Sequence, residues 1–409
     1  MRRLFTPSTI VSVGIIAAVA AMVAVANWRD ARRSHAASTR SLSLGTRGAG
    51  TGRRDLGQRI VDLRAAVAAR PEDVGAAVML ADALIRQTRI TGNTGLAIEA
   101  EAALKRAFSA DPANYDASRE LGSLLLSQHR FREAIAVGEK NRAVRPYDAI
   151  NYGVTGDGHL ELGEYDEAFA AFDRMMALRP SAASYARVAY ARELQGNLTG
   201  AIEAMQLAAD ADAPDDPEAL AWHHAQVGDL YLRLGKTHEA ESAYVAASHA
   251  FPGHPFAMMG YARLLALRGE QSSALALLQE LARTAPTPDL AARTGDLLAR
   301  LGRRDEAERQ YALAEAGWRV DAPEPRNLAR FLADHDRKVP EAVAIAEKAR
   351  VERHDIFTED ALAWAYFKAG RVADAREAIA RALRTGTADA DIRAHAKAIE
   401  AAAGEAAVR

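Results

Sequence analysis

Apolar positions recur with the period of an α-helix from about residue 55 onwards. Leu56, Ile60, Leu63 and Val67 are spaced three or four residues apart, which places them on one face of a helix. The pattern predicts a helix over residues 55–71, ending at Pro71. Aromatic residues make up only 6% of the chain and alanine is abundant, a composition that suits closely packed helices better than a sheet.

A repeat is visible in the spacing of the prolines. Pro112, Pro146, Pro180 and Pro214 follow one another at intervals of 34 residues. After a short slip, Pro252 and Pro286 show the same interval. A fixed period of this length is typical of arrays built from helix–turn–helix units, so one elongated array is expected rather than two or three separate domains.

The segment that ends at Pro180 shows the unit best. It has Gly156 in its first helix, Gly163 at the turn, Ala168 in the second helix and Phe172 one turn later. This order of small, turn, small, aromatic and proline residues resembles the tetratricopeptide repeat (TPR) family. The resemblance implies an all-α fold, a right-handed α-solenoid of about nine TPR-like helix–turn–helix repeats with capping helices at both ends.

The register of the units follows from positions that carry the same kind of residue. The alanine of the second helix is found nine times, at Ala100, Ala134, Ala168, Ala201, Ala240, Ala274, Ala307, Ala342 and Ala375. Small residues of the first helix are expected against it at Gly122, Gly156, Ala189, Gly228, Ala262, Gly295 and Ala363. Turn glycines, which favour a left-handed helix end, are Gly163, Gly196, Gly235, Gly269, Gly302 and Gly370.

Some units depart from this pattern. The second unit has His129 at the turn, and the eighth unit is irregular. About seven extra residues around Thr88–Gly95 separate the two helices of the first unit, and further slips lie at Asp210–Pro217 and Trp318–Pro325. Insertions in repeat arrays usually form loops on one face.

The N-terminus differs from the array. Residues 10–26 contain no charged side chain and end in Ala24-Val25-Ala26, so residues 1–27 fit either a cleaved secretory signal or an uncleaved membrane anchor. Residues 28–54 are expected to form a flexible basic linker. The remaining division is a capping helix at 55–71, the array at 72–386 and a solvent-facing capping helix with a tail at 387–409.

Charge is distributed unevenly along the chain. Residues 1–54 contain nine arginines and one acidic residue, a net charge of +8; since the whole chain carries −2, the rest carries −10. An acidic body disfavours nucleic acid as a partner. The arginines after residue 26 outnumber Arg2 and Arg3, so an uncleaved anchor would keep the repeats in the cytoplasm, whereas a cleaved signal would export them. We favour export, and hence the cell envelope.

Motifs of catalysis are not found in the sequence. It lacks a metalloprotease H-E-x-x-H, a P-loop, a dinucleotide-binding glycine motif and a nucleophile elbow. The chain has no cysteine, which excludes disulfides and thiolate sites. The histidines His223, His224, His238, His249 and His254 are interpreted as surface or groove residues rather than metal ligands. No enzymatic activity, cofactor or metal is therefore expected.

The TPR resemblance also implies a binding surface, because arrays of this family bind peptides on their inner face. The inner positions implied here are Tyr190, Trp222, Asp229, Phe256, Met259, Arg263, Asp296, Trp364 and Phe367. Trp222 and Trp364 are equally consistent with packing between helices. The subset of the family that binds a C-terminal carboxylate needs asparagine where this chain has Ser123, Asp157, Tyr190, Asp229 and Arg263, so that function is not supported.

Together these features predict a non-enzymatic scaffold or assembly factor at the cell envelope. It would bind a protein or peptide partner in the concave groove, and would touch the membrane through the N-terminal segment if that segment is uncleaved. A permanent structural or regulatory subunit of a membrane complex is the alternative, and an enzyme is the least favoured class.

Overall fold

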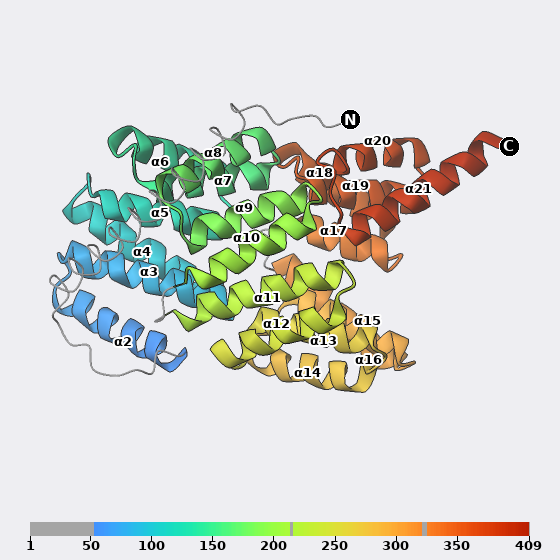
Figure 1. The fold of residues 1–409 in the computed structure, drawn as a ribbon, viewed down its shortest axis with the longest axis horizontal. Helices are drawn as coiled ribbons and strands as arrows, with labels where there is room; N and C mark the ends of the chain where they lie inside the picture. Colours follow the sequence, from blue (N-terminus) through green and yellow to red (C-terminus); the bar gives the residue numbers. More distant parts are fainter. Residues whose placement is uncertain (1–52, 213–215, 321–324, 409) are drawn as a thin grey trace, which may run out of the picture. The chain divides into compact units, whose positions relative to one another are not determined.

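A computed structural model describes residues 53–212, 216–320 and 325–408, and within these ranges the regular structure consists of twenty α-helices and no strands (Figure 1). The segment predicted as a signal or anchor, and all of the basic linker but its last two residues, lie outside the described residues. None of the described helices is long and apolar enough to cross a bilayer.

Consecutive helices pack in pairs, and nine pairs follow one another between α2 (Arg53–Ala69) and α21 (Ala390–Val408). The first four units are α3 (Val74–Thr91) with α4 (Thr94–Ala110), α5 (Tyr115–Ser127) with α6 (Phe131–Val144), α7 (Ala149–Leu162) with α8 (Tyr165–Leu178), and α9 (Ala182–Leu194) with α10 (Leu198–Asp210). The remaining five are α11 (Pro217–Arg233) with α12 (Thr237–Ala250), α13 (Pro255–Leu267) with α14 (Gln271–Thr284), α15 (Pro288–Arg300) with α16 (Arg304–Val320), α17 (Pro325–Asp334) with α18 (Val339–Glu352), and α19 (Ile356–Lys368) with α20 (Val372–Ala382). The predicted TPR-type solenoid is confirmed.

The alanine register matches the packing. All nine alanines of the second helices are buried, with at most 2% of their surface exposed. Six turn glycines have positive φ, from 73° at Gly235 to 84° at Gly269. His129 takes the same left-handed conformation in the second unit, with φ 58°, and the eighth unit uses Asp336 and Lys338. The irregular units therefore keep the turn geometry without glycine.

Glycines of the first helices make room for aromatic rings of the second helices. A Cβ atom added at Gly228 would lie 2.6 Å from the ring of Tyr244, and one added at Gly295 would lie 2.5 Å from the ring of Tyr311. The ring of Phe172 packs in the same way against Gly156. The aromatic residue one turn after the buried alanine thus fills the space that the glycine leaves.

The extra residues of the first unit lengthen its two helices. They do not form a loop, because α3 has 18 residues and α4 has 17, whereas α5 and α6 have 13 and 14. Gly92 ends α3 with φ 68°, and the side chain of Asn93 accepts a hydrogen bond from the backbone of Gly95 to cap α4. Both helices are lengthened instead. The other two interruptions fall partly outside the described residues.

Late units of the array contact early ones. Figure 1 shows α18 and α19 beside α7 and α8, and the backbone N–H of His354 donates a hydrogen bond to the carbonyl of Leu162 at 2.9 Å. The backbones of Gly196 and Gly386 also approach closely, because a Cβ atom added at Gly196 would lie 2.5 Å from the carbonyl oxygen of Gly386. The final helix, α21, buries Ile392 and Ile399 completely, so it has one packed face and is not exposed all round.

Candidate functional site

A groove of about 1020 Å³ lies over the first four units. Its lining comes mainly from the first helix of each unit and from the α3–α4 and α5–α6 connections. The lining residues, which define the groove, are Ile85, Thr88, Arg89, Gly92, Thr94, Ala97, Ile98, Ser123, Leu126, Ser127, Gln128, His129, Phe131, Ile150, Val154, Asp157, Glu161, Met175, Ala183 and Arg187.

Apolar side chains remain accessible in this groove. Ile98 exposes 69% of its surface and Ile150 exposes 37%. Hydroxyl and amide groups, including those of Ser123 and Gln128, lie among the apolar residues. Such a mixture can bury apolar side chains of a ligand and also bond to its backbone.

Four charged side chains of the groove are paired within the protein. Arg187 binds Asp157 through two hydrogen bonds of 2.9 and 2.6 Å. Arg89 donates to Glu218 at 2.5 Å, and Glu161 pairs with Arg353.

Glu218, the partner of Arg89, has a lowered pKa. Burial alone would raise its pKa, but the interactions with His254 and Arg89 outweigh this effect and lower the pKa to about 2. The carboxylate is therefore ionised at every physiological pH, and its pair with Arg89 joins α3 to α11.

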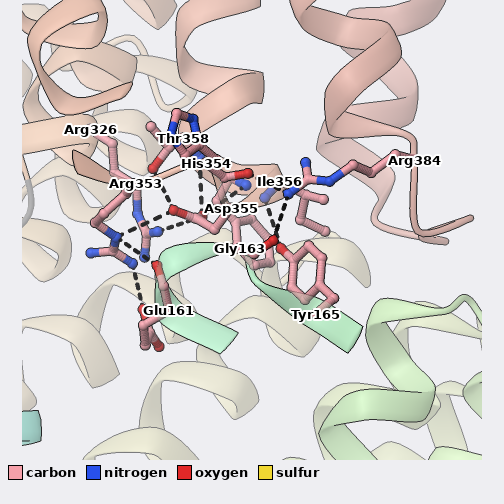
Figure 2. Close-up of polar contacts among 11 residues, drawn as sticks. Glu161, Gly163, Tyr165, Arg326, Arg353, His354, Asp355, Ile356, Thr358 and Arg384 are labelled. Carbon is pink, nitrogen blue, oxygen red and sulfur yellow. Dashed lines mark hydrogen bonds and ion pairs between the residues drawn. The ribbon is translucent and has the colours of Figure 1, made fainter. Parts of the chain in front are cut away.

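The far end of the groove meets a contact that we call the clasp, in which Glu161–Tyr165 lies against Arg353–Ile356 and Arg384 (Figure 2). Besides the bond between His354 and Leu162, the hydroxyl of Tyr165 accepts a hydrogen bond from the backbone N–H of Ile356 at 2.9 Å. Arg384 donates to the carbonyls of Gly163 and His354. Two turns that are far apart in the sequence are thus joined through their backbones.

Local capping fixes the second half of the clasp. Asp355 is the N-cap of α19 and accepts hydrogen bonds from the backbone N–H groups of Phe357 and Thr358, both at 3.1 Å. Arg326 donates to the same carboxylate at 2.6 Å (Figure 2). Asp355 is only 3% exposed, so these donors stabilise a buried charge.

Four of the residues predicted for binding do lie together. Asp229, Phe256, Met259 and Arg263 line a small hollow of about 70 Å³ with Gly260 and Arg293. Arg263 and Asp229 form an ion pair of 2.6 Å, and the hydroxyl of Tyr244 donates to the same carboxylate. Phe256 is 38% exposed.

The other predicted residues are spread over the array and pack against neighbouring helices. Tyr190 and Trp222 are half-buried against two different cores. Asp296 accepts hydrogen bonds from Tyr311 at 3.0 Å and from His335 at 2.8 Å. These three residues have structural contacts, and their role in binding stays a prediction.

Trp364 and Phe367 lie beneath the final helix. The Trp364 ring stacks on Phe367 at 5.0 Å and on His395 of α21 at 4.0 Å. His395 in turn bonds to the buried Asp360 at 2.9 Å. This arrangement is packing between α19 and α21, which is one of the two roles expected for Trp364.

Two of the histidines around the fifth unit, His223 and His254, are buried, contrary to the expectation of surface or groove residues, because each pairs with one carboxylate. His223 lies 2.6 Å from Asp212, and His254 lies 3.7 Å from Glu218. In the described part of the chain, histidine, aspartate and glutamate side chains form no group that could hold a metal ion.

The groove over the first four units was not predicted as a whole. The sequence-based prediction placed the binding surface at the aromatic residues of the fourth to sixth units instead. The same register, however, placed Ser123 and Asp157 at inner positions, and both line the groove. What the sequence does not show is that Ile98 and Ile150 remain exposed.

Comparison with known proteins agrees with the repeat assignment. The sequence profile of the tetratricopeptide repeat matches residues 95–148, 154–217 and 228–291, and these segments carry tetratricopeptide repeats. A curated relative, the Hsp70-Hsp90 organizing protein of Triticum aestivum, is 35% identical over 83 residues. That match covers 20% of this chain and 14% of the wheat protein, so the chain spans a small part of that relative.

Solved structures with the same fold cover more of the chain. The Cut9–Hcn1 structure of the APC/C matches 85% of this chain and 60% of its own, with a TM-score of 0.53 and 14% identity. The human IFIT1 dimer with PPP-AAAA matches 76% of this chain and 73% of its own, with a TM-score of 0.52 and 16% identity. At this identity the likeness shows the fold alone.

Proposed function

We propose that this protein is a non-enzymatic scaffold or assembly factor that binds a segment of a protein partner in the groove of its first four units. Tetratricopeptide repeats support a protein-interaction role in general. The particular site is supported by one observation, namely a groove of about 1020 Å³ in which Ile98 and Ile150 are accessible.

The chemistry of the groove favours an uncharged, apolar segment. Arg89, Asp157, Glu161 and Arg187 already have partners within the protein, so a charged ligand would have to compete with an existing ion pair. Apolar side chains of the partner would instead cover Ile98 and Ile150. The hydroxyl and amide groups of Ser123 and Gln128 would bond to the partner's backbone.

A peptide library tests this site without knowledge of the natural partner. Peptides are selected on the full-length protein from a random display library, and their affinity is measured by fluorescence anisotropy. Ile98→Ala and Ile150→Ala are each expected to raise the Kd of a selected peptide about tenfold, since truncating a buried anchor costs about 1–2 kcal/mol in binding.

Leu313→Ala is the matched control. Leu313 is 60% exposed on α16 and does not line the groove, so its truncation is expected to leave the Kd unchanged. If the selected peptides bind equally well to wild type, Ile98→Ala and Ile150→Ala, the groove is not the binding site.

A location at the cell envelope, with the repeats outside the cytoplasm, is part of the same proposal and rests on the sequence of residues 1–54. A reporter that is active only outside the cytoplasm, fused after Arg54, is expected to give a signal. Deletion of residues 10–26 should abolish it. A silent reporter together with membrane-bound full-length protein would place the repeats inside.

A further inference from the structure

Arg353 joins the clasp to the groove. It follows α18 directly, and only 9% of its side chain is exposed. Its Nε donates to the backbone carbonyl of Glu161 at 3.0 Å, and a terminal nitrogen donates to the Glu161 carboxylate (Figure 2). Its guanidinium also lies 4.9 Å from the centre of the Phe131 ring.

Glu161 and Phe131, the two contacts of Arg353 in early units, belong to the groove wall. Glu161 and Phe131 line the groove from the third and second units, whereas Arg353 is 192 residues further along than Glu161. A second hollow, of about 420 Å³, is also lined by Phe131 and is bordered by Arg326 and Arg353. Phe131 therefore borders both hollows, and the guanidinium is one of the contacts of its ring.

We propose that Arg353 is a positioning residue of the groove, through which the last two units set the place of its wall at Glu161 and Phe131. This inference rests on the proposed function of the groove. It adds that affinity for a partner depends on a residue which does not line the groove itself.

The chemistry of arginine suits this role. Its planar guanidinium can donate to the carbonyl and the carboxylate of Glu161 in one plane and still stack on an aromatic face. A lysine keeps the charge but offers a single ammonium group without the planar face. Arg353→Lys is therefore expected to loosen the groove wall while it keeps a positive charge next to Glu161.

Arg350 provides the matched control. It lies on α18, three residues before Arg353, and its Nε donates to the buried Glu359 of α19 at 2.9 Å. Both arginines bond to carboxylates of the last two units, Arg350 to Glu359 and Arg353 to Asp355 at 3.3 Å, but Arg353 also bonds to Glu161 of an early unit. Arg350→Lys thus changes the same chemical group at a contact between late helices.

The test uses the full-length protein and a peptide selected from the random display library. Hydrogen exchange followed by mass spectrometry measures the amides of residues 126–131 and 157–162, and anisotropy measures the Kd of the peptide. In Arg353→Lys we expect exchange in both segments to be about three- to tenfold faster and the Kd to rise by a similar factor, whereas Arg350→Lys changes neither. Arg353→Gln serves as a second variant if the lysine variant does not fold.

The outcomes separate this inference from the proposed function. Unchanged exchange in both segments, or faster exchange with an unchanged Kd, would overturn the positioning role of Arg353 and leave the groove in place. If the Kd is also unchanged in Ile98→Ala and Ile150→Ala, the groove is not the binding site, and the positioning role of Arg353 is overturned with it.

Discussion

At the scale of single residues, small side chains decide how closely the two helices of a unit approach. Ala168 is fully buried and lies in one core with Phe172, whose ring fills the space beside Gly156. The described members of this core are hydrophobic residues, so a charge placed among them would be costly to bury. The identity of the residue at this position therefore matters more than its helix propensity.

Ala168→Asp tests this packing. An unpaired carboxylate at this site is expected to lower the free energy of unfolding by about 3 kcal/mol or more. Ala170→Asp, at an exposed position of the same helix, is the control and should be close to neutral. Equal melting temperatures for the two variants in a thermal unfolding experiment would contradict the assigned core.

A second residue-scale feature is the pair of His335 and Asp296. Both ring nitrogens of His335 face acceptors, the Phe331 carbonyl and the Asp296 carboxylate, each at 2.8 Å. Burial alone would lower the pKa of His335, but the bonds to Asp296 and Phe331 raise it above its usual value. Burial alone would likewise raise the pKa of Asp296, and the bonds from His335 and Tyr311 bring it below its usual value.

The sign of the pH dependence follows from these two shifts. The raised pKa of His335 stabilises the fold below about pH 6.5, and this contribution is lost as the pH rises through the folded pKa. The lowered pKa of Asp296 contributes above about pH 4 and is lost on acidification. We expect His335→Gln to lower the melting temperature more at pH 5.5 than at pH 9. Asp334 and Arg300, which also act on this pair, are present in both proteins, and an equal decrease at the two pH values would contradict the charged pair.

At the scale of elements, the turns between paired helices share a left-handed glycine, but some of these glycines face open space and others face a distant segment of the chain. Gly235 has φ 73°, and apart from its two neighbours in the chain no described residue lies within 4 Å of a Cβ added there. Gly163 has φ 82°, but a Cβ at this position would collide with the backbone of His354 in the clasp. The first glycine serves the turn alone, and the second also allows a distant segment to approach.

Replacing each glycine by alanine separates these roles. Gly235→Ala is expected to cost about 1–2 kcal/mol, the cost of a left-handed alanine. Gly163→Ala is expected to cost about 1–3 kcal/mol more, because the clasp has to shift. Chemical denaturation of the two variants measures the difference, and equal costs would show that the clasp contributes nothing at Gly163.

Sequence patterns predicted the local features of the elements well. The 34-residue period, the buried alanines and the turn glycines all depend on contacts within a unit or with its neighbour, and these contacts repeat. The clasp was not predicted, since it depends on how the small rotation of each unit accumulates over the intervening units. The groove was found only in part, because the register assigns Ser123 and Asp157 to the inner face but does not tell whether Ile98 is covered.

At the scale of the whole array, contacts between distant units change how stability is shared. An array with contacts only between neighbours transmits damage along the sequence, and the effect fades with each unit. Here the third unit contacts the eighth and ninth through Leu162, Tyr165 and their partners, and Arg233 of α11 binds Asp389, just before α21, at 3.4 Å. Damage in the last unit therefore has a direct path to the third.

Ala375→Asp tests this path. Ala375 is fully buried in α20, so the charge destabilises the ninth unit. We expect the amides of α7 and α8 to exchange faster in the variant, and to change more than those of α13 and α14, which lie closer in sequence. Hydrogen exchange resolved by peptide measures both pairs. A larger change in α13 and α14 than in α7 and α8 would show that the clasp does not couple the stability of the third unit to that of the ninth.

The clasp also has a consequence for how the protein is made. Glu161 leaves the ribosome 192 residues before Arg353, which at about 5–20 residues per second is a delay of about 10–40 s. The contact depends on the arrangement of the folded units between them, so it forms only after the late units have been synthesised. Through this interval the nascent third unit exposes the surface of Tyr165 and Leu162 that Ile356 and His354 later cover. A chaperone that shields this surface during translation would thus act on the early units before the last ones exist.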